Sequence, residues 1–157
     1  YRHKLLRLVG EYLGCSRVSL WRFSGEGEAM SLICRSSFEA AGLDLASGAQ
    51  LNRKQFKAYF DRVLQLGAFV CPDVRGEPVL EGLREPYLDP QDVRALLDVS
   101  FGVNGRQYGV ICCEQFGQPR AWTQTDVNTL LRVSRLVSLQ VARVLSDSTG
   151  EPHYSAD

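Results

Sequence analysis

Hydrophobic positions along the chain repeat at two different spacings, and the spacing predicts which segments are helices. In residues 2–13, apolar side chains recur every three or four positions, as on one face of a helix, and Gly14 suits the left-handed conformation that commonly ends one. A second helical pattern begins at Asn52, with Gln55 three positions later as its capping partner, and Gly67 ends it. Two amphipathic helices are therefore predicted in the first half of the chain.

A third and longer helix is predicted from Thr123 to about Leu145. Thr123 with Asp126 three positions later resembles a capping box in which Asp replaces the usual Glu or Gln. Its apolar residues repeat at intervals of seven, in the series Val127, Ser134, Val141 and Leu130, Val137, Val144, while Leu131, Leu136, Leu139 and Leu145 widen the apolar surface. The pattern fits either a wide core face or pairing with a second copy of the chain.

Strands are predicted where apolar and polar residues alternate between turn signals. Asn104-Gly105 is a strong hairpin turn, because both residues tolerate a positive φ. The Pro-, Gly- and acid-rich stretch 75–92 is expected to be irregular, with a short helical turn at Asp89-Pro90, and to cover one face of the sheet. The tail 146–157 lacks apolar periodicity and is expected to be disordered. The predicted strands are 17–24, 29–38, 68–74, 93–103 and 107–116.

This order of elements predicts an α+β fold, an α/β sandwich with a central antiparallel sheet and helices packed on one face. At 157 residues the chain suits one domain, residues 1–145, followed by the tail. The chain begins with Tyr1 instead of Met, so it is expected to be a segment of a longer protein. No stretch is long and apolar enough for a membrane span, and no membrane contact is expected.

Charge and cysteine usage narrow the class of protein. Eighteen basic and eighteen acidic residues are interspersed without a Lys/Arg block, which argues against nucleic-acid binding. The five cysteines form no CxxC pair and leave an odd count, which favours the reducing cytoplasm and small buried thiols; they are Cys15, Cys34, Cys71, Cys112 and Cys113. Neighbouring residues of a strand point to opposite faces, so the adjacent pair is not expected to share one metal.

Three segments together resemble a GAF domain, the sensory module of bacterial signalling proteins, over residues 3 to 145. They are "RVSLWRFS", "PYLDPQDVRALLDVSF" and "NGRQYGVICCEQFGQPRAWTQTD". The last resembles the stretch "GVxCxEHVGxxRxWT" of domains in sensor histidine kinases and diguanylate cyclases, although Gln115 and Phe116 stand where His and Val are common. The resemblance implies a GAF-like sheet with the first and last helices on one face and a ligand pocket on the other, under the irregular segment.

Strand alternation projects that implied pocket onto particular residues. Ser19 and Trp21 of the first strand, with Cys112 and Glu114 of the last, are expected to face the ligand. Trp21 either stacks on a ligand or fills the core, and Glu114 either contacts a ligand or pairs with Arg120 or Arg106. Asp98, an acid in an apolar strand, is expected to be held by a backbone group or an arginine. Asp73 and Tyr87, at the two ends of the cover, are further candidates.

The leading functional hypothesis is a non-catalytic input domain that binds an unidentified small molecule and signals to an effector domain. A homodimer through helices 1–14 and 123–145 is expected. The alternatives are a structural dimerisation module with a filled pocket and a thiol enzyme such as a free methionine sulfoxide reductase.

Other chemistries find little support in the sequence. The segment in which those reductases carry their nucleophile has no cysteine here, and the only histidines, His3 and His153, lie near the termini, so no metal or haem site is expected. Neither Cys71-Pro72 nor the 112–113 pair resembles the chromophore motif of bilin-carrying relatives. The cofactor, if any, is left open.

Overall fold

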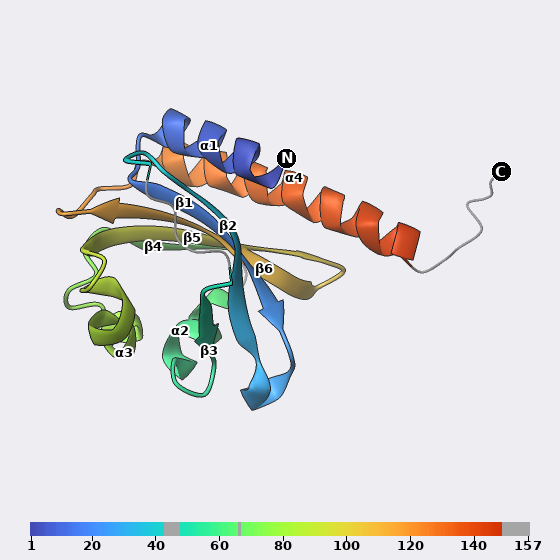
Figure 1. Ribbon diagram of the computed structural model, residues 1–157, viewed down its shortest axis with the longest axis horizontal. Coiled ribbons are helices and arrows are strands. Elements are labelled where there is room, and N and C mark those ends of the chain that lie inside the picture. Colours follow the sequence, from blue (N-terminus) through green and yellow to red (C-terminus); the bar gives the residue numbers. More distant parts are fainter. Residues whose placement is uncertain (43–47, 66, 149–157) are drawn as a thin grey trace.

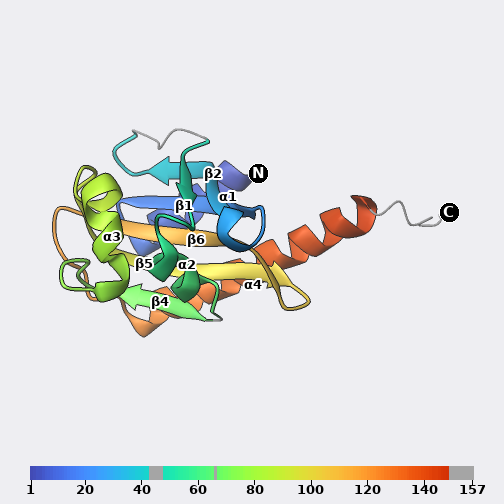
Figure 2. The ribbon, with the colours of Figure 1, turned by 90° about the horizontal axis from the view of Figure 1, so that it is seen from below.

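A computed structural model of the protein describes residues 1–42, 48–65 and 67–148. Six antiparallel strands form one sheet in the order β3-β2-β1-β6-β5-β4, with α1 and α4 on one face and α2 and α3 on the other (Figures 1 and 2). The strands are β1 (Arg17–Ser24), β2 (Ser31–Glu39), β3 (Gln50–Asn52), β4 (Ala68–Cys71), β5 (Val93–Val103) and β6 (Arg106–Phe116). The helices are α1 (Arg2–Leu13), α2 (Lys57–Val63), α3 (Glu81–Leu83) and α4 (Gln124–Ser148), with shorter helical turns η1 (Gly27–Ala29), η2 (Pro78–Leu80) and η3 (Arg84–Leu88).

The fold class and the main elements predicted from the sequence are confirmed. The β5–β6 hairpin turns at Asn104 and Gly105, whose φ values of 53° and 78° are those of the turn that Asn-Gly favours. At the start of α4, the hydroxyl of Thr123 accepts from the backbone N–H of Asp126 at 3.0 Å. The carboxylate of Asp126 accepts from the N–H of Thr123, also at 3.0 Å.

The segment predicted as an irregular cover is mostly helical, and that prediction is corrected. Residues 78–88, which we call the cover, run through η2, α3 and the π-helical turn η3, and the Asp89-Pro90 turn follows the helical segment. The buried leucines Leu80, Leu83 and Leu88 are spaced by three and then five positions, which does not match regular helical periodicity. The π-helical turn explains the wider gap, because it carries one more residue per hydrogen-bonded ring.

One strand was not predicted, and several element boundaries differ by a few residues, including the ends of β2 and β4. The short strand β3 lies in a stretch expected to be a loop, and it pairs with β2. Helix α2 begins at Lys57, because the Asn52 side chain accepts from the N–H of Gln55 in a turn before the helix. Helix α4 continues to Ser148, so 146–148 do not belong to a disordered tail. Residues 149–157, the rest of the predicted tail, lie outside the described residues.

The sheet separates two hydrophobic cores. On the side of α1 and α4, strands β1, β5 and β6 contribute Val18, Leu97, Ile111 and Cys113, among others, to a core closed by the helices. On the opposite side, Trp21, Leu96 and Cys112 from the same three strands meet the side chains of α2 and the cover. We call these two sides the helix face and the cover face.

The loop between β6 and α4 ties several elements together through Arg120. Its guanidinium donates to the carbonyl of Leu13 at the end of α1 at 2.7 Å and to Asp126 of α4 at 3.3 Å. Its backbone N–H donates to the carbonyl of Pro72 after β4 at 3.0 Å. The guanidinium also lies over the ring of Trp122, 4.4 Å from the ring centroid. The end of α1 and the start of α4 are thus joined by one side chain.

Candidate functional site

The candidate site is built where β1 and β6 run side by side on the cover face. Their register places Arg17 opposite Glu114 and Ser19 opposite Cys112. Since successive residues of a strand alternate between faces, Cys112 joins the core of the cover face and Cys113 the core of the helix face. The adjacent cysteines are therefore separated by the sheet.

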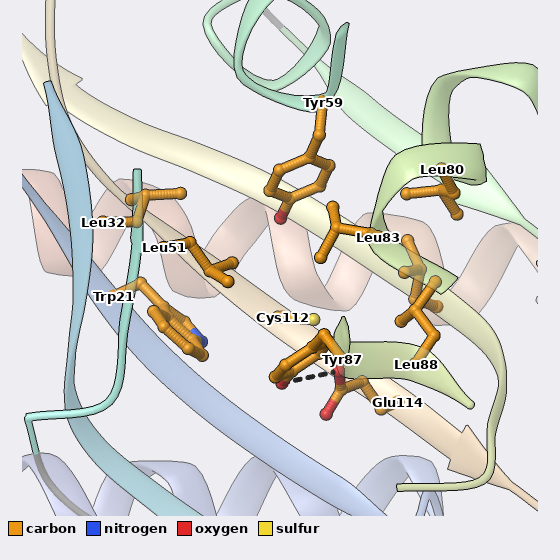
Figure 3. A pocket seen from close by; sticks show the side chains of 11 residues that line it. Trp21, Leu32, Leu51, Tyr59, Leu80, Leu83, Tyr87, Leu88, Cys112 and Glu114 are labelled. Atoms are coloured by element: carbon orange, nitrogen blue, oxygen red, sulfur yellow. Dashed lines mark hydrogen bonds between the residues drawn. The ribbon is translucent and has the colours of Figure 1, made fainter. Parts of the chain in front are cut away.

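An ion-pair cluster around Arg17 is buried at one end of this site. The guanidinium donates to Glu114 at 2.6 Å, to Glu39 at 3.1 Å and to the Tyr87 hydroxyl at 3.1 Å. The Tyr87 hydroxyl in turn donates to the second oxygen of Glu114 at 3.2 Å (Figure 3). Arg17 and Glu114 are only 3% and 1% exposed, so each needs the other to offset the cost of leaving water.

The cluster also fixes the ionisation of its members. Burial alone would lower the pKa of the Arg17 guanidinium, but the charge of Glu114 and its hydrogen bonds raise that pKa above its ordinary value. Burial and the nearby carboxylate of Glu114 raise the pKa of Tyr87 well above its usual range, so its hydroxyl stays protonated and can donate. The cover is consequently held to β1 and β6 through the hydroxyl of Tyr87.

A second polar cluster centres on Asp98 of β5, which lies opposite Cys112 in the register. The hydroxyl of Tyr59 from α2 donates to Oδ2 of Asp98 at 2.5 Å, whereas Oδ1 is buried and has no hydrogen-bond partner that meets normal geometry. Burial raises the pKa of Asp98 to about 7, although the Cys112 thiol and the Tyr59 hydroxyl act in the opposite direction. Near neutral pH this carboxyl is balanced between its neutral and charged forms.

Between the two clusters and the cover lies a cavity of about 20 Å³. Its walls are Trp21, Leu32, Leu51, Tyr59, Leu80, Leu83, Tyr87, Leu88, Leu96, Cys112 and Glu114 (Figure 3). Trp21 meets Tyr87 edge to face, with ring centroids 6.3 Å apart. A volume of this size holds about one water molecule. The position in which the resemblance implies a ligand is thus almost filled by the chain's own side chains.

Four of the six residues predicted to face the pocket line this cavity: Trp21, Tyr87, Cys112 and Glu114. Ser19 lies on the same face, fully buried, and its hydroxyl accepts from the Trp21 ring N–H at 2.8 Å, so it positions that ring. Asp73 does not line the cavity. Its carboxylate accepts from the N–H of Arg75 at 3.0 Å and lies 3.5 Å from the Arg94 guanidinium. Their roles in ligand binding stay predictions.

The predicted partners of two acids are wrong. Glu114 pairs with Arg17, from the neighbouring strand, and not with Arg120 or Arg106. Asp98 is held by the Tyr59 hydroxyl and not by a backbone group or an arginine. In both cases the partner lies in a segment remote in sequence.

Arg17 and Tyr59 are the residues that the sequence analysis missed. Arg17 follows the alternation of Ser19 and Trp21 along β1, so the same pattern could have placed it on the cover face. Tyr59 lies at helical spacing in the segment after Asn52, so the sequence pattern indicates an apolar helix face and gives no separate signal for its hydroxyl. The sequence analysis also missed three leucines of the cover that line the cavity, because their spacing is irregular: Leu80, Leu83 and Leu88.

The thiols of the described cysteines are all buried and free. Burial raises the pKa of the Cys112 thiol well above its usual range, and the charges of Asp98 and Glu114 raise it further. A nucleophilic thiol needs the opposite, a lowered pKa and access to substrate. Within residues 1–42, 48–65 and 67–148, no three His, Cys, Asp or Glu side chains are grouped to hold a metal ion.

The sequence profile of the GAF domain family matches residues 3–141, and the chain belongs to this family. No protein of curated function matches it significantly. None of the helices described is long and apolar enough to cross a membrane.

Solved structures with a similar fold include several photoreceptor domains. The GAF domain of PixJ from Thermosynechococcus elongatus has a TM-score of 0.76 and 18% identity, over 98% of this chain and 92% of that one. The third GAF domain of Slr1393 from Synechocystis sp. PCC6803 also has a TM-score of 0.76, with 17% identity over 94% and 95%. A far-red-absorbing domain with bound biliverdin IXα, JSC1_58120g3, has a TM-score of 0.73 and 19% identity over 88% and 85%. At these identities the likeness concerns the fold.

Proposed function

We propose that this GAF domain is a non-catalytic sensory module that binds a small molecule between the sheet and the cover. The observation that carries the proposal is the Asp98 carboxyl, which is 1% exposed and lies directly behind Tyr59 and Cys112, two walls of the cavity. Its Oδ1 accepts no hydrogen bond of normal geometry, and its remaining neighbour is the Cys112 thiol, a weak donor. An unpaired buried polar atom costs about 1–3 kcal/mol. A ligand N–H or O–H donor at this point would remove that cost, which gives a ligand-bound form a specific advantage.

Binding at this point requires the cover to move, because the cavity holds about one water molecule. The polar connection between cover and sheet is the Tyr87 hydroxyl, which contacts Arg17 and Glu114. A ligand that replaced these contacts would release the cover and leave the Arg17–Glu114 pair intact. Such a ligand shifts the equilibrium between closed and open covers only by its difference in affinity for the two forms.

The photoreceptor neighbours suggest a tetrapyrrole as one ligand class, but the residues of this pocket do not fit it. A cavity of about 20 Å³ is far too small for four pyrrole rings. The one thiol that lines it, Cys112, has its pKa raised by burial, which disfavours a covalent bond to a chromophore. We therefore infer a smaller ligand with hydrogen-bond donors.

The output of the module is proposed to pass through α1 and α4 to an effector in the full-length protein. The bacterial sensor kinases and diguanylate cyclases named by the sequence resemblance are the proposed context, and the cytoplasm is the proposed location. The thiol-enzyme alternative is disfavoured, because the pKa of Cys112 is shifted away from that of a nucleophile.

The second candidate is a structural dimerisation module, and the filled cavity favours it. Large apolar side chains are exposed on both terminal helices, where a second copy would cover them. They are Leu8 and Tyr12 on α1 and Leu136, Leu139 and Val144 on α4. In this case the charged clusters of the cover face are only structural.

Native mass spectrometry of the purified protein, followed by denaturation and analysis of what is released, separates the two functions. A small molecule bound at one per chain and absent from an Asp98→Leu variant of unchanged fold supports the sensory module. Replacing Asp73 by Leu is the matched control, because its half-exposed carboxylate pairs with Arg94 and contacts no wall of the cavity, and this variant is expected to keep the molecule. A dimer of both proteins without a bound molecule supports the structural module.

A further inference from the structure

A much larger hollow lies on the helix face, where α4 runs past the start of α1. Its volume is about 500 Å³, within the range of roughly 300–1,000 Å³ typical of small-molecule pockets. The walls are mostly apolar: Leu20 and Phe101 from the sheet, Leu5 from α1, and Val137 and Val141 from α4. We call this hollow the helix-side groove. The sheet separates it from the cavity under the cover.

Two irregularities of the sheet direct extra side chains into this groove. Leu20 pairs with Ser36 and the next residue, Trp21, pairs with Cys34, so that Arg35 of β2 has no partner on β1. In the β5–β6 pair, the register shift between Phe101 and Gly102 leaves Tyr108 without a partner in the same way. Arg35 and Tyr108 both line the groove. Bulges of this kind interrupt the ladder and often re-aim a side chain beside a functional site.

Two glycines near the β5–β6 register shift, Gly102 and Gly109, also make contacts beside the groove. The N–H of Gly102, at the register shift, donates to the hydroxyl of Ser138 on α4 at 3.1 Å. Gly109 lacks the Cβ that would collide with the Trp21 backbone oxygen and meet the Phe101 ring at 2.5 Å, so its backbone approaches both closely. The hydrogen bond ties α4 to the sheet beside the groove, and the missing Cβ leaves room for the Phe101 ring that lines it.

The charges around the groove are all of one sign. Arg2 of α1, Arg22 of β1 and Arg35 of β2 line it, and no acidic residue is among its walls. None of the three arginines forms an ion pair within the part of the chain that the structure describes. Acidic and basic residues are equal in number in the whole chain, so three cations beside an apolar floor are a local excess.

From this combination we propose that the helix-side groove binds an amphipathic anion, a carboxylate with an aliphatic chain. The chain lies against Leu20, Phe101 and Val141, and the carboxylate is held by Arg22 and Arg35, whose guanidinium groups suit carboxylate geometry. The groove is formed jointly by α1, α4 and the sheet. A ligand here therefore contacts both terminal helices directly, independently of any ligand under the cover.

Calorimetric titration with sodium dodecanoate, below its micelle concentration, tests the proposal. We expect saturable binding of one molecule per chain. Dodecyltrimethylammonium and dodecanol, which have the same chain but a cationic or neutral head, are expected to bind at least tenfold more weakly. The double variant Arg22→Gln/Arg35→Gln should weaken dodecanoate binding at least tenfold. Arg143→Gln, an exposed arginine of α4 that does not line the groove, is the matched control and should leave it unchanged.

A second variant locates the site without touching its charges. Val141→Trp fills the groove and should abolish dodecanoate binding, while circular dichroism and urea unfolding confirm that the fold is kept. Binding that is indifferent to the head group, or unchanged in the double arginine variant, overturns the proposal. The proposal is also overturned if dodecanoate shows no saturable binding and the protein self-associates in a way that Val144→Glu abolishes. The groove would then belong to an interface between two copies.

Discussion

The cover face and the helix face of the sheet are built from the same strands but use their space in opposite ways. The cover face buries a guanidinium, two carboxyls and two tyrosine hydroxyls around a cavity of about 20 Å³. The helix face buries almost only apolar side chains, yet keeps a groove of about 500 Å³ whose charges lie at its rim. Alternation along β1 and β6 produces both arrangements, since each strand contributes to each face.

This contrast shows that buried charge and open volume are separate properties of a candidate site. Arg17 and Glu114 are buried on the cover face because each is the partner of the other, and this pairing fixes the positions of the groups around it. An apolar wall imposes no such geometry, so the helix face tolerates empty space. A ligand on the cover face must therefore compete with existing hydrogen bonds, while one on the helix face needs only to displace water.

The largest expected effect comes from breaking the central charge pair of the cover face. Arg17→Met leaves Glu114 buried and unpaired, and should reduce the free energy of unfolding by about 3–5 kcal/mol, measured by urea denaturation. The double variant Arg17→Met/Glu114→Leu removes both charges and should recover most of this loss. Arg22→Met, the exposed arginine of the same strand, should change stability by less than about 0.5 kcal/mol. A loss in Arg17→Met no greater than that control would contradict the role of the pair.

The second effect is a pH dependence that arises from Asp98. Its pKa of about 7 in the folded state lies above the ordinary value of 3.8, so the folded protein binds a proton more tightly than the unfolded chain does. This group therefore favours folding below about pH 4, and its contribution is lost as the pH rises through 7, by an amount on the order of 4 kcal/mol.

Asp98→Asn keeps the shape of the side chain and removes the titration. The variant should be more stable than the natural protein at pH 8, and this advantage should be smaller by about 2–3 kcal/mol at pH 5, as measured by urea unfolding at both values. If the difference in stability is the same at the two pH values, the carboxyl does not titrate as the burial of this residue indicates.

A smaller effect is expected from loosening the cover. Tyr87→Phe removes a hydroxyl that bonds to Arg17 and Glu114, and should cost about 1–3 kcal/mol. Hydrogen exchange in residues 78–88 should become faster, whereas exchange in β5 and β6 changes little. Tyr108→Phe, which removes a hydroxyl on the helix face, is the matched control. Equal acceleration throughout the sheet would show that the cover does not open separately.

The smallest effect concerns the capping box on the helix face. Thr123→Ala removes the hydroxyl that accepts from the Asp126 N–H and should lower the free energy of unfolding by about 1 kcal/mol, measured by thermal or urea unfolding. Thr125→Ala, an exposed position in the first turn of α4, should be close to neutral. An equally large loss in the control would show that the capping bond contributes nothing specific.

Local patterns predicted most of the fold, because the signals for strands and helix ends lie close together in sequence. Asn104-Gly105 between two alternating runs predicted the β5–β6 hairpin, and Thr123 with Asp126 predicted the start of α4. The cover was misread because Leu80 and Leu88 lie on one buried surface only through a π-helical turn, which leaves no regular period.

For the candidate site, strand alternation predicts the face on which a residue lies but not the residue that it contacts on another strand. Alternation placed Trp21 and Cys112 on the cover face. The Arg17–Glu114 pair joins positions 97 apart, so it depends on the register of β1 against β6. The bulge at Arg35 depends on the register of β1 against β2. Whether a pocket is open or filled depends on how side chains from several elements pack, which no local pattern encodes.

The Arg120 contacts hold α4 at its first turn, so a tilt of this helix would have its fixed point there. They fasten its start to the end of α1, and the other end of α4 extends beyond the sheet (Figure 1). At 25 residues α4 is about 37 Å long, so a pivot of about 10° at the fastened end displaces the free end by about 6 Å. In such a pivot the displacement would be smallest at Arg120 and largest at the far end of α4. Distances between spin labels on α1 and α4, measured once near Arg120 and once at the far end of α4, test this pivot. An equal change in the two distances would show that the pivot is absent.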